Sequence, residues 1–196
     1  MNRAVFLDRD GTLNPLVYYA DTQEYESPRT PETLTLLDGV ESALSRLSAS
    51  GYRLFLVSNQ PSYAKGKTSL ENLQAVHARL SQELGSKGVQ LTEAYYCYHH
   101  PKGIVPALTT VCNCRKPGIE SLLRARDTYG LDLTESWMIG DQDSDIQCGL
   151  KAGCRTILLD YGPSANKRDV TPDLQPNARG MSLQQAVIYI LSQETK

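Results

Sequence analysis

The sequence predicts an α/β fold, a Rossmann-like three-layer sandwich whose mainly parallel sheet is covered by helices on both faces. Two observations lead to this prediction. Short, uninterrupted apolar runs recur along the chain, and segments with apolar residues at helical spacing separate them. Uninterrupted apolar runs are typical of strands buried on both faces. Their alternation with amphipathic helices along the chain is typical of a parallel sheet.

Five apolar runs are the expected strands. In chain order they are residues 4–7, 54–57, 92–97, 137–139 and 156–159. Each run is short enough for a strand and too short for a helix. The first one, Ala4-Val-Phe-Leu7, stands directly before an acid, so its carboxyl end is marked in the sequence itself.

Five further segments are the expected helices. They are residues 40–49, 70–84, 117–129, 145–152 and 183–191. In residues 70–84 a stripe of leucine and valine side chains at helical spacing ends before Gly85. Pro117 and Gly130 are expected to begin and end the helix between them, because proline suits the first turn and glycine the residue after the last.

Residues 14–37 match neither pattern. The segment contains Pro15, Pro28 and Pro31 among many polar residues. Such a length is unusual for a simple connection inside a compact domain. We therefore expect a functional loop or a small lid there.

The composition is that of an average globular protein, with 196 residues, 40% hydrophobic residues and 21% charged ones. We expect a single domain, residues 1–196, without a large cap domain. The net charge of −2 and the lack of a basic run argue against nucleic-acid binding. No apolar run is long enough for a signal peptide or a membrane span, so we expect a cytoplasmic protein. We also expect a monomer. Thiols stay reduced in that compartment, and clustered cysteines there favour metal binding over disulfides.

Polar residues follow the expected strands where ligands bind in parallel sheets, at the carboxyl ends. Asp8 and Asp10 follow the first strand, and Asp141 follows the fourth. Three carboxylates in one place repel each other unless a cation lies among them, and oxygen ligands favour Mg²⁺. Lys116 would supply a positive charge for a phosphate, and the Ser58 hydroxyl would bind its oxygens. Gly11 would permit a sharp turn and offer its amide to a phosphate oxygen.

The ordered set Asp8-x-Asp10-Gly-Thr, then Ser58, then Lys116, then Gly140-Asp141 resembles the four motifs of the haloacid-dehalogenase superfamily of phosphatases. The resemblance implies that Asp8 attacks phosphorus and forms an aspartyl-phosphate. It implies that Asp10 protonates the leaving oxygen and then takes a proton from water. Mg²⁺ would be bound by Asp8, by the backbone carbonyl of Asp10 and by Asp141.

Three nearby charged residues are less determined by the sequence. Asp145 either lies beside the metal site or is merely a favourable acid in the first turn of a helix. Asp143 fits the second description only. Arg9 is expected to point away from the site as an ion-pair partner, because alternation in an extended chain puts it opposite its neighbours.

A cluster of potential soft-metal ligands lies between residues 97 and 114. Cys97-x-His99 and Cys112-x-Cys114 supply three thiols and an imidazole, a set that suits structural Zn²⁺. A disulfide and plain buried thiols are the alternatives. The segment resembles the zinc loop of the superfamily branch that contains heptose bisphosphate and histidinol-phosphate phosphatases, and that pattern favours His99 over His100. Zinc would fix a loop that leads directly into Arg115 and Lys116.

The resemblance also suggests a substrate. The long stretch between the ligand pairs, and the run from Ser136 to Asp141, are similar to the heptose branch. This implies removal of the 7-phosphate of D-glycero-D-manno-heptose 1,7-bisphosphate, with Asn59 and Arg115 binding substrate. Pro61-Ser62 and Gln142 depart from the usual pattern. Histidinol phosphate, another sugar phosphate, or an inactive zinc-stapled scaffold are the alternatives.

One further histidine and two further cysteines are interpreted as structural residues. His77 is expected on a helix, as a surface residue. Cys148 and Cys154 are expected to be buried packing residues rather than ligands.

Overall fold

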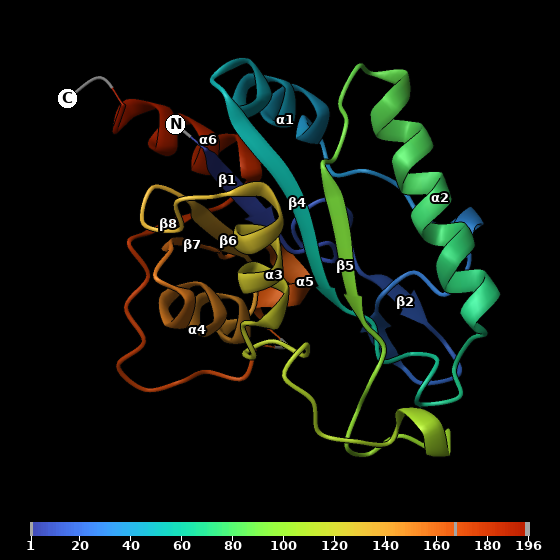
Figure 1. Ribbon diagram of the computed structural model, residues 1–196. Coiled ribbons are helices and arrows are strands. Elements are labelled where there is room, and N and C mark those ends of the chain that lie inside the picture. Colours follow the sequence, from blue (N-terminus) through green and yellow to red (C-terminus); the bar gives the residue numbers. More distant parts are fainter. Residues whose placement is uncertain (1, 167, 195–196) are drawn as a thin grey trace.

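A computed structural model of the chain describes residues 2–166 and 168–194. Its centre is a six-stranded sheet with the order β5-β4-β1-β6-β7-β8. The strands are β1 (Arg3–Leu7), β4 (Tyr52–Asn59), β5 (Glu93–Cys97), β6 (Trp137–Gly140), β7 (Arg155–Leu159) and β8 (Ala178–Gly180). Every pairing in this sheet is parallel, which confirms the predicted α/β class (Figure 1).

Helices cover both faces of the sheet because consecutive side chains of each strand point in opposite directions. Val5 and Leu7 belong to the core under α1 (Val40–Ala49), α2 (Leu70–Ser86) and α6 (Leu183–Ser192). Ala4 and Phe6 belong to the core under α3 (Glu120–Tyr129) and α4 (Asp143–Ala152). Cys148 and Cys154 are buried in this second core, as expected.

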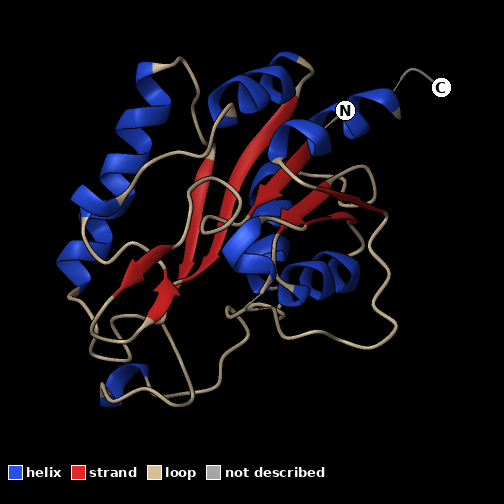
Figure 2. Ribbon diagram, turned by 180° about the vertical axis from the view of Figure 1, so that it is seen from behind, coloured by secondary structure: helices blue, strands red, loops and turns tan. Residues whose placement is uncertain are grey.

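The segment 14–37 contains structure that the sequence did not suggest. β2 (Val17–Tyr19) and β3 (Glu24–Glu26) form an antiparallel hairpin, and a 3₁₀ turn follows at Pro31–Thr33. The hairpin and the loop after β5, which includes a 3₁₀ turn at Pro106–Leu108, lie at the end of the sheet to which β4 and β5 point (Figures 1 and 2). Both segments therefore lie beside the carboxyl ends of the strands.

One expectation about an element was wrong, and two short elements were not foreseen. The helix expected from Pro117 begins at Glu120, because residues 115–118 form a turn in which the Gly118 amide donates to the Arg115 carbonyl at 2.7 Å. The short strand β8 and the short helix α5 (Gly162–Ala165) were not foreseen. Both are too short to leave a periodic pattern in the sequence. None of the described helices is long and apolar enough to cross a membrane.

Candidate active site

The site is built on two neighbouring strands. β1 and β6 pair in parallel, and the Asp8 amide just beyond β1 donates to the Ile139 carbonyl at 2.9 Å. This pairing brings Asp8 and Asp141, which follow the two strands, to the same edge of the sheet. Both side chains are largely withdrawn from solvent, with residue exposures of 7% and 1%.

Lys116 connects the carboxylates of the site. Its ammonium group donates to Asp8 Oδ1 at 2.7 Å and to the Val57 carbonyl at 2.6 Å, and it pairs with Asp145 Oδ1 at 2.6 Å. The residue is only 4% exposed. Burial alone would lower the pKa of Lys116, but the carboxylates of Asp145 and Asp8 outweigh burial and raise it. Lys116 is therefore a buried, permanent positive charge beside Asp8.

The single positive charge of Lys116 does not balance the negative charges of the acids around it. Carboxylate oxygens of Asp8, Asp141 and Asp145 lie within 4.8 Å of one another. Burial, together with the charges of Asp8 and Asp145, raises the pKa of Asp141 well above its ordinary value. Burial also raises the pKa of Asp145 to about 6, although Lys116 opposes the shift. The cluster as it stands has an excess of negative charge.

The carboxylate cluster fits a hard divalent cation. Asp141 Oδ1 is buried and has no hydrogen-bond partner among the residues that the structure describes. Asp145 is already engaged, since it pairs with Lys116 and accepts from the Gln142 amide at 3.0 Å. Asp8 and Asp141 are thus the two side chains best placed to bind such an ion. Of the two readings of Asp145, a place beside the metal site agrees with this geometry, and its capping bond at the start of α4 exists as well.

Gly11 lets the first loop approach this cluster. Its φ is +84°, and a Cβ there would lie 2.6 Å from Asp141 Cγ, which no ordinary contact permits. The expectation that its amide serves a phosphate was wrong. Gly11 is buried, and its amide donates to the Asn14 carbonyl at 2.7 Å, which closes the turn.

Asp10 lies in a different environment from Asp8. Its carboxylate accepts from Arg9 Nε at 3.1 Å, from Asn14 Nδ2 at 2.9 Å and from Gln60 Nε2 at 2.5 Å. Arg9 is an ion-pair partner as expected, but it does not point away from the site. The alternation argument failed because the chain leaves the strand at Asp8 and turns around the Arg9 carbonyl, which accepts from three amides.

Ser58 and Asn59 end β4 and differ in what their side chains contact. Ser58 Oγ is buried and accepts from Gln60 Nε2 at 3.0 Å. Asn59, which we expected to bind substrate, holds the backbone of Lys116, with its side-chain amide donating to the Lys116 carbonyl at 3.1 Å and accepting from the Lys116 amide at 3.0 Å. Asn59 still lines the cavity of the site.

The four expected soft ligands converge. Cys114 Sγ lies 3.3 Å from Cys97 Sγ, 3.1 Å from Cys112 Sγ and 3.4 Å from His99 Nδ1. All five cysteines are free, so the disulfide alternative finds no support in the structure. Burial raises the pKa of the Cys97 and Cys114 thiols, so a cation is needed to hold them together as thiolates. This donor set could hold zinc.

The other two histidines lie outside this cluster. His100 Nδ1 accepts from the Lys102 amide at 3.0 Å. His77 lies on α2, as expected, is partly exposed, and shares a 2.9 Å hydrogen bond with the Tyr96 hydroxyl.

A cavity of about 370 Å³ opens above the carboxylates. Asp8, Asp10, Lys116, Asp141 and Asp145 line its floor, and Lys65, Lys67, Arg115 and the hairpin residues 24–27 line its rim. Arg115 Nη1 also donates to the carbonyl of His99 at 3.5 Å, which ties it to the cysteine loop. The cavity therefore has an acidic floor and a rim of mixed charge, on which Lys65, Lys67 and Arg115 stand beside Glu24 and Glu26.

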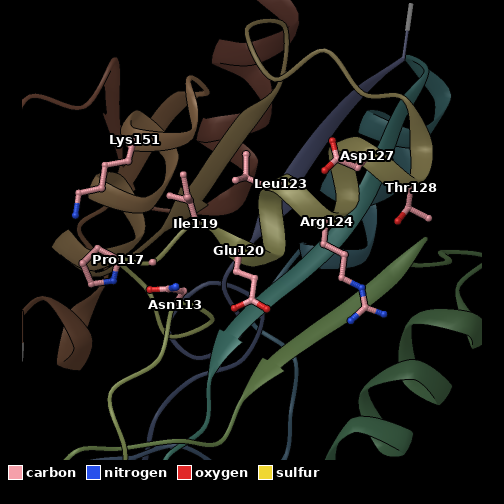
Figure 3. Close-up of a pocket in the computed structure, with 10 residues that line it drawn as sticks. Asn113, Pro117, Ile119, Glu120, Leu123, Arg124, Asp127, Thr128 and Lys151 are labelled. Atoms are coloured by element: carbon pink, nitrogen blue, oxygen red, sulfur yellow. The ribbon is translucent and has the colours of Figure 1, made fainter.

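A second hollow, of about 720 Å³, runs along α3. Figure 3 shows its walls, with Glu120, Arg124 and Asp127 on α3 and Lys151 on the neighbouring helix α4. It contains none of the carboxylates of the cluster. The smaller cavity is therefore the candidate active site.

Several residues of the site were not foreseen as such. Gln60 and Asn14 bind Asp10, and Gln142 Nε2 donates to Asp141 Oδ2 at 2.6 Å. The position of Gln142 directly after Asp141 was noted only as a departure from a pattern. Neutral amides carry no signal of their own in a sequence, because they occur on any protein surface.

Comparisons with known proteins agree with this geometry. A family model described as HAD-hydrolase-like matches residues 113–186. The chain is 36% identical over 156 residues to D-glycero-beta-D-manno-heptose-1,7-bisphosphate 7-phosphatase of Escherichia coli strain K12, covering 80% of this chain and 78% of that protein. It is 34% identical over 150 residues to the protein of the same name from Rhodopseudomonas palustris, covering 76% and 79%. The D,D-heptose 1,7-bisphosphate phosphatase of B. bronchiseptica, solved with magnesium and phosphate, superposes with a TM-score of 0.78 at 23% identity, covering 97% and 99%.

Proposed function

Because this chain belongs to the family of D-glycero-D-manno-heptose-1,7-bisphosphate 7-phosphatases, within the haloacid-dehalogenase superfamily, we propose that it removes the 7-phosphate of that sugar bisphosphate. The whole chain would act as one phosphatase domain. The observation that carries the proposal is the meeting of Asp8, Lys116 and Asp141 at the floor of one cavity, in a chain with this family membership.

Asp8 is the proposed nucleophile. One of its carboxylate oxygens forms a bond to phosphorus while the bond from phosphorus to the sugar oxygen breaks, and Asp10 gives its proton to that oxygen. Water then attacks the aspartyl-phosphate and gives its proton to Asp10, the bond from phosphorus to Asp8 breaks, and both residues return to their first state. Phosphate leaves as the second product.

Lys116 and Ser58 would stabilise the transferring group. The Lys116 ammonium lies 2.7 Å from Asp8 Oδ1, so it is beside the carboxylate that forms the bond to phosphorus. Phosphoryl transfer depends mostly on positioning and on neutralising charge, which a buried and permanent cation supplies.

Mg²⁺ would be held by Asp8 and Asp141 side chains and by the backbone carbonyl of Asp10. When bound, the ion would offset the negative charge of the carboxylates and of the phosphate. The unpartnered oxygen of Asp141 and the excess of negative charge support this assignment.

Zn²⁺ would be held by Cys97, His99, Cys112 and Cys114. Its role would be structural, since four protein ligands leave no open position. Arg115 follows Cys114 directly and donates to the carbonyl of His99, so ordering this loop would also order Arg115 at the rim of the cavity.

Arg115 is the proposed contact for the second phosphate of the substrate. It lines the rim, whereas Lys116 lies on the floor, so the two neighbours serve different parts of the cavity. Lys65 and Lys67 stand on the same rim, and Lys67 is paired with Glu26 of the hairpin. A bisphosphate would meet positive charge at both ends.

Phosphate release from a panel of substrates in the presence of Mg²⁺ tests the proposal. The panel holds both anomers of D-glycero-D-manno-heptose 1,7-bisphosphate, histidinol phosphate and other sugar phosphates. We expect the highest kcat/KM for a heptose bisphosphate, with loss of one phosphate only. Preference for histidinol phosphate would contradict the substrate, and the lack of any turnover would favour the inactive scaffold.

A further inference from the structure

Gln60 lies at the centre of a buried hydrogen-bond network at the end of β4. It is 1% exposed. Its Nε2 donates to Asp10 Oδ2 at 2.5 Å and to Ser58 Oγ at 3.0 Å, and its Oε1 accepts from Arg9 Nη2 at 2.8 Å. Both hydrogens of the amide and its oxygen are thus engaged inside the protein.

Among the side chains that bind the Asp10 carboxylate, Gln60 has a distinct place. Arg9 and Asn14 belong to the same turn as Asp10, so their bonds fix the carboxylate relative to that turn. Gln60 directly follows β4, and its bond fixes the carboxylate relative to the sheet. The loss of Gln60 would free Asp10 to move with its turn.

The position of Gln60 is itself determined by the sheet. Its backbone amide donates to the carbonyl of Cys97, the last residue of β5, at 2.7 Å. The pairing of β4 with β5 therefore sets where the side-chain amide can reach. A side chain held at both its backbone and its tip is well suited to aim another group.

We propose that Gln60 is a positioning residue, which aims the Asp10 carboxylate at the leaving oxygen and orients the Ser58 hydroxyl toward the transferring phosphate. This inference rests on the proposed function, because it gives Gln60 a part in the same reaction. The Ser58 oxygen accepts a hydrogen bond from Gln60, so the hydrogen of the hydroxyl points elsewhere and can serve a phosphate oxygen.

The leaving group separates these two effects. A sugar alkoxide needs a proton as it departs, so its release depends on where Asp10 points. A p-nitrophenolate departs without one, so p-nitrophenyl phosphate reports mainly on the groups that bind the transferring phosphate. The ratio of kcat/KM for the sugar phosphate to kcat/KM for p-nitrophenyl phosphate therefore measures the contribution of Asp10.

The experiment measures this ratio in the wild type and in five variants. Gln60→Leu and Asp10→Asn are expected to lower it about tenfold or more. Ser58→Ala and Gln74→Leu are expected to leave it unchanged, the first because it acts on the phosphate, the second because Gln74 is on the exposed side of α2. In the double variant Asp10→Asn/Gln60→Leu the ratio should equal that of Asp10→Asn alone, since the effect of Gln60 passes through Asp10.

The outcomes distinguish the inference from the function on which it rests. Turnover of the bisphosphate by the wild type is established first, and the ratio then uses whichever sugar phosphate is hydrolysed. If Gln60→Leu lowers turnover of both substrates by the same factor, Gln60 does not position Asp10. If this variant does not fold, Gln60→Asn gives the same readout, because it keeps the amide but is one methylene too short to reach Asp10.

Discussion

Asn59 and Lys116 are joined by a pair of hydrogen bonds, one in each direction between the side-chain amide of Asn59 and the backbone of Lys116. Two residues far apart in the chain thereby act as one unit, in which the end of β4 holds the turn that carries the buried lysine. The ammonium group of Lys116 can point at Asp8 because its backbone is fixed in this way.

This relationship predicts a graded loss of activity. Asn59→Leu removes both bonds and should lower kcat/KM about tenfold, given a net value of ~0.5–1.5 kcal/mol for each bond. Asn59→Asp keeps the acceptor for the Lys116 amide and should lose less. Both variants should affect sugar and aryl phosphates alike, as measured by phosphate release. A loss confined to the sugar bisphosphate would instead support direct contact between Asn59 and substrate.

Asp8→Asn and Asp10→Asn are expected to fail in different ways. Asp8→Asn removes the nucleophile and should show neither turnover nor covalent phosphate. Asp10→Asn keeps the nucleophile, so with a good leaving group some phospho-enzyme should accumulate. Intact-protein mass spectrometry after rapid acid quench detects the added phosphate. Near-normal turnover by Asp8→Asn would show that another group attacks.

Substitutions of Arg115 and of Lys116 should differ in which substrates they affect. Arg115→Ala should lower kcat/KM on the bisphosphate about 30- to 150-fold, the equivalent of ~2–3 kcal/mol for a charge-assisted contact, and barely change that on an aryl phosphate. Lys116→Ala should damage both. If Arg115→Ala harms the two substrates equally, the arginine serves the chemistry or the loop and not the second phosphate.

Zinc should be tightly bound and structural. Elemental analysis of purified protein should find about one zinc per chain, and chelation should lower Tm by more than about 4 °C, since at this size ~1 kcal/mol corresponds to about 2–4 °C. Cys114→Ser should lose zinc, whereas Cys154→Ala, outside the cluster, should keep it. A disulfide between Cys97 and Cys112 or Cys114 in freshly prepared protein would contradict this assignment.

The contribution of Glu26 to the stability of the protein should depend on pH. Burial would raise the pKa of Glu26, but the ion pairs with Lys67 and Arg29 outweigh burial and lower it. A lowered pKa means that this contribution is fully present above the ordinary glutamate value of 4.5 and is lost as the pH falls below it. Glu26→Gln should therefore lower Tm by about 2–4 °C at pH 7, for a loss of ~1 kcal/mol.

At acid pH the wild type and the Glu26→Gln variant should have the same Tm. Glu26 is then protonated in the wild type and resembles the glutamine of the variant, so the difference in Tm should vanish. The measurement is a series of thermal melts between neutral and acid pH. A difference that stays constant across the series would mean that the ion pairs contribute nothing to stability.

Local patterns in the sequence were sufficient to predict the main strands and helices of the fold and the carboxylates that line the floor of the cavity. The apolar runs before Asp8 and Asp141 predicted two buried strands, and parallel strands bring their carboxyl ends to one edge, as the pairing of β1 with β6 does. The spacing of the cysteines likewise predicted a cluster. These predictions depend on residue type and short-range spacing, which a sequence displays directly.

The hydrogen-bond partners of these groups could not be predicted, because they depend on contacts between distant parts of the chain. Gln60 meets Asp10 across 50 positions, and Asn59 meets Lys116 across 57. Arg9 turned toward Asp10 because the chain leaves its strand after Leu7 and turns, whereas the alternation argument assumed an extended chain through Asp10. A hydrogen bond requires its two groups to lie about 3 Å apart. Which amide reaches which carboxylate follows from strand order and register, so these partners became visible only once the sheet was assembled.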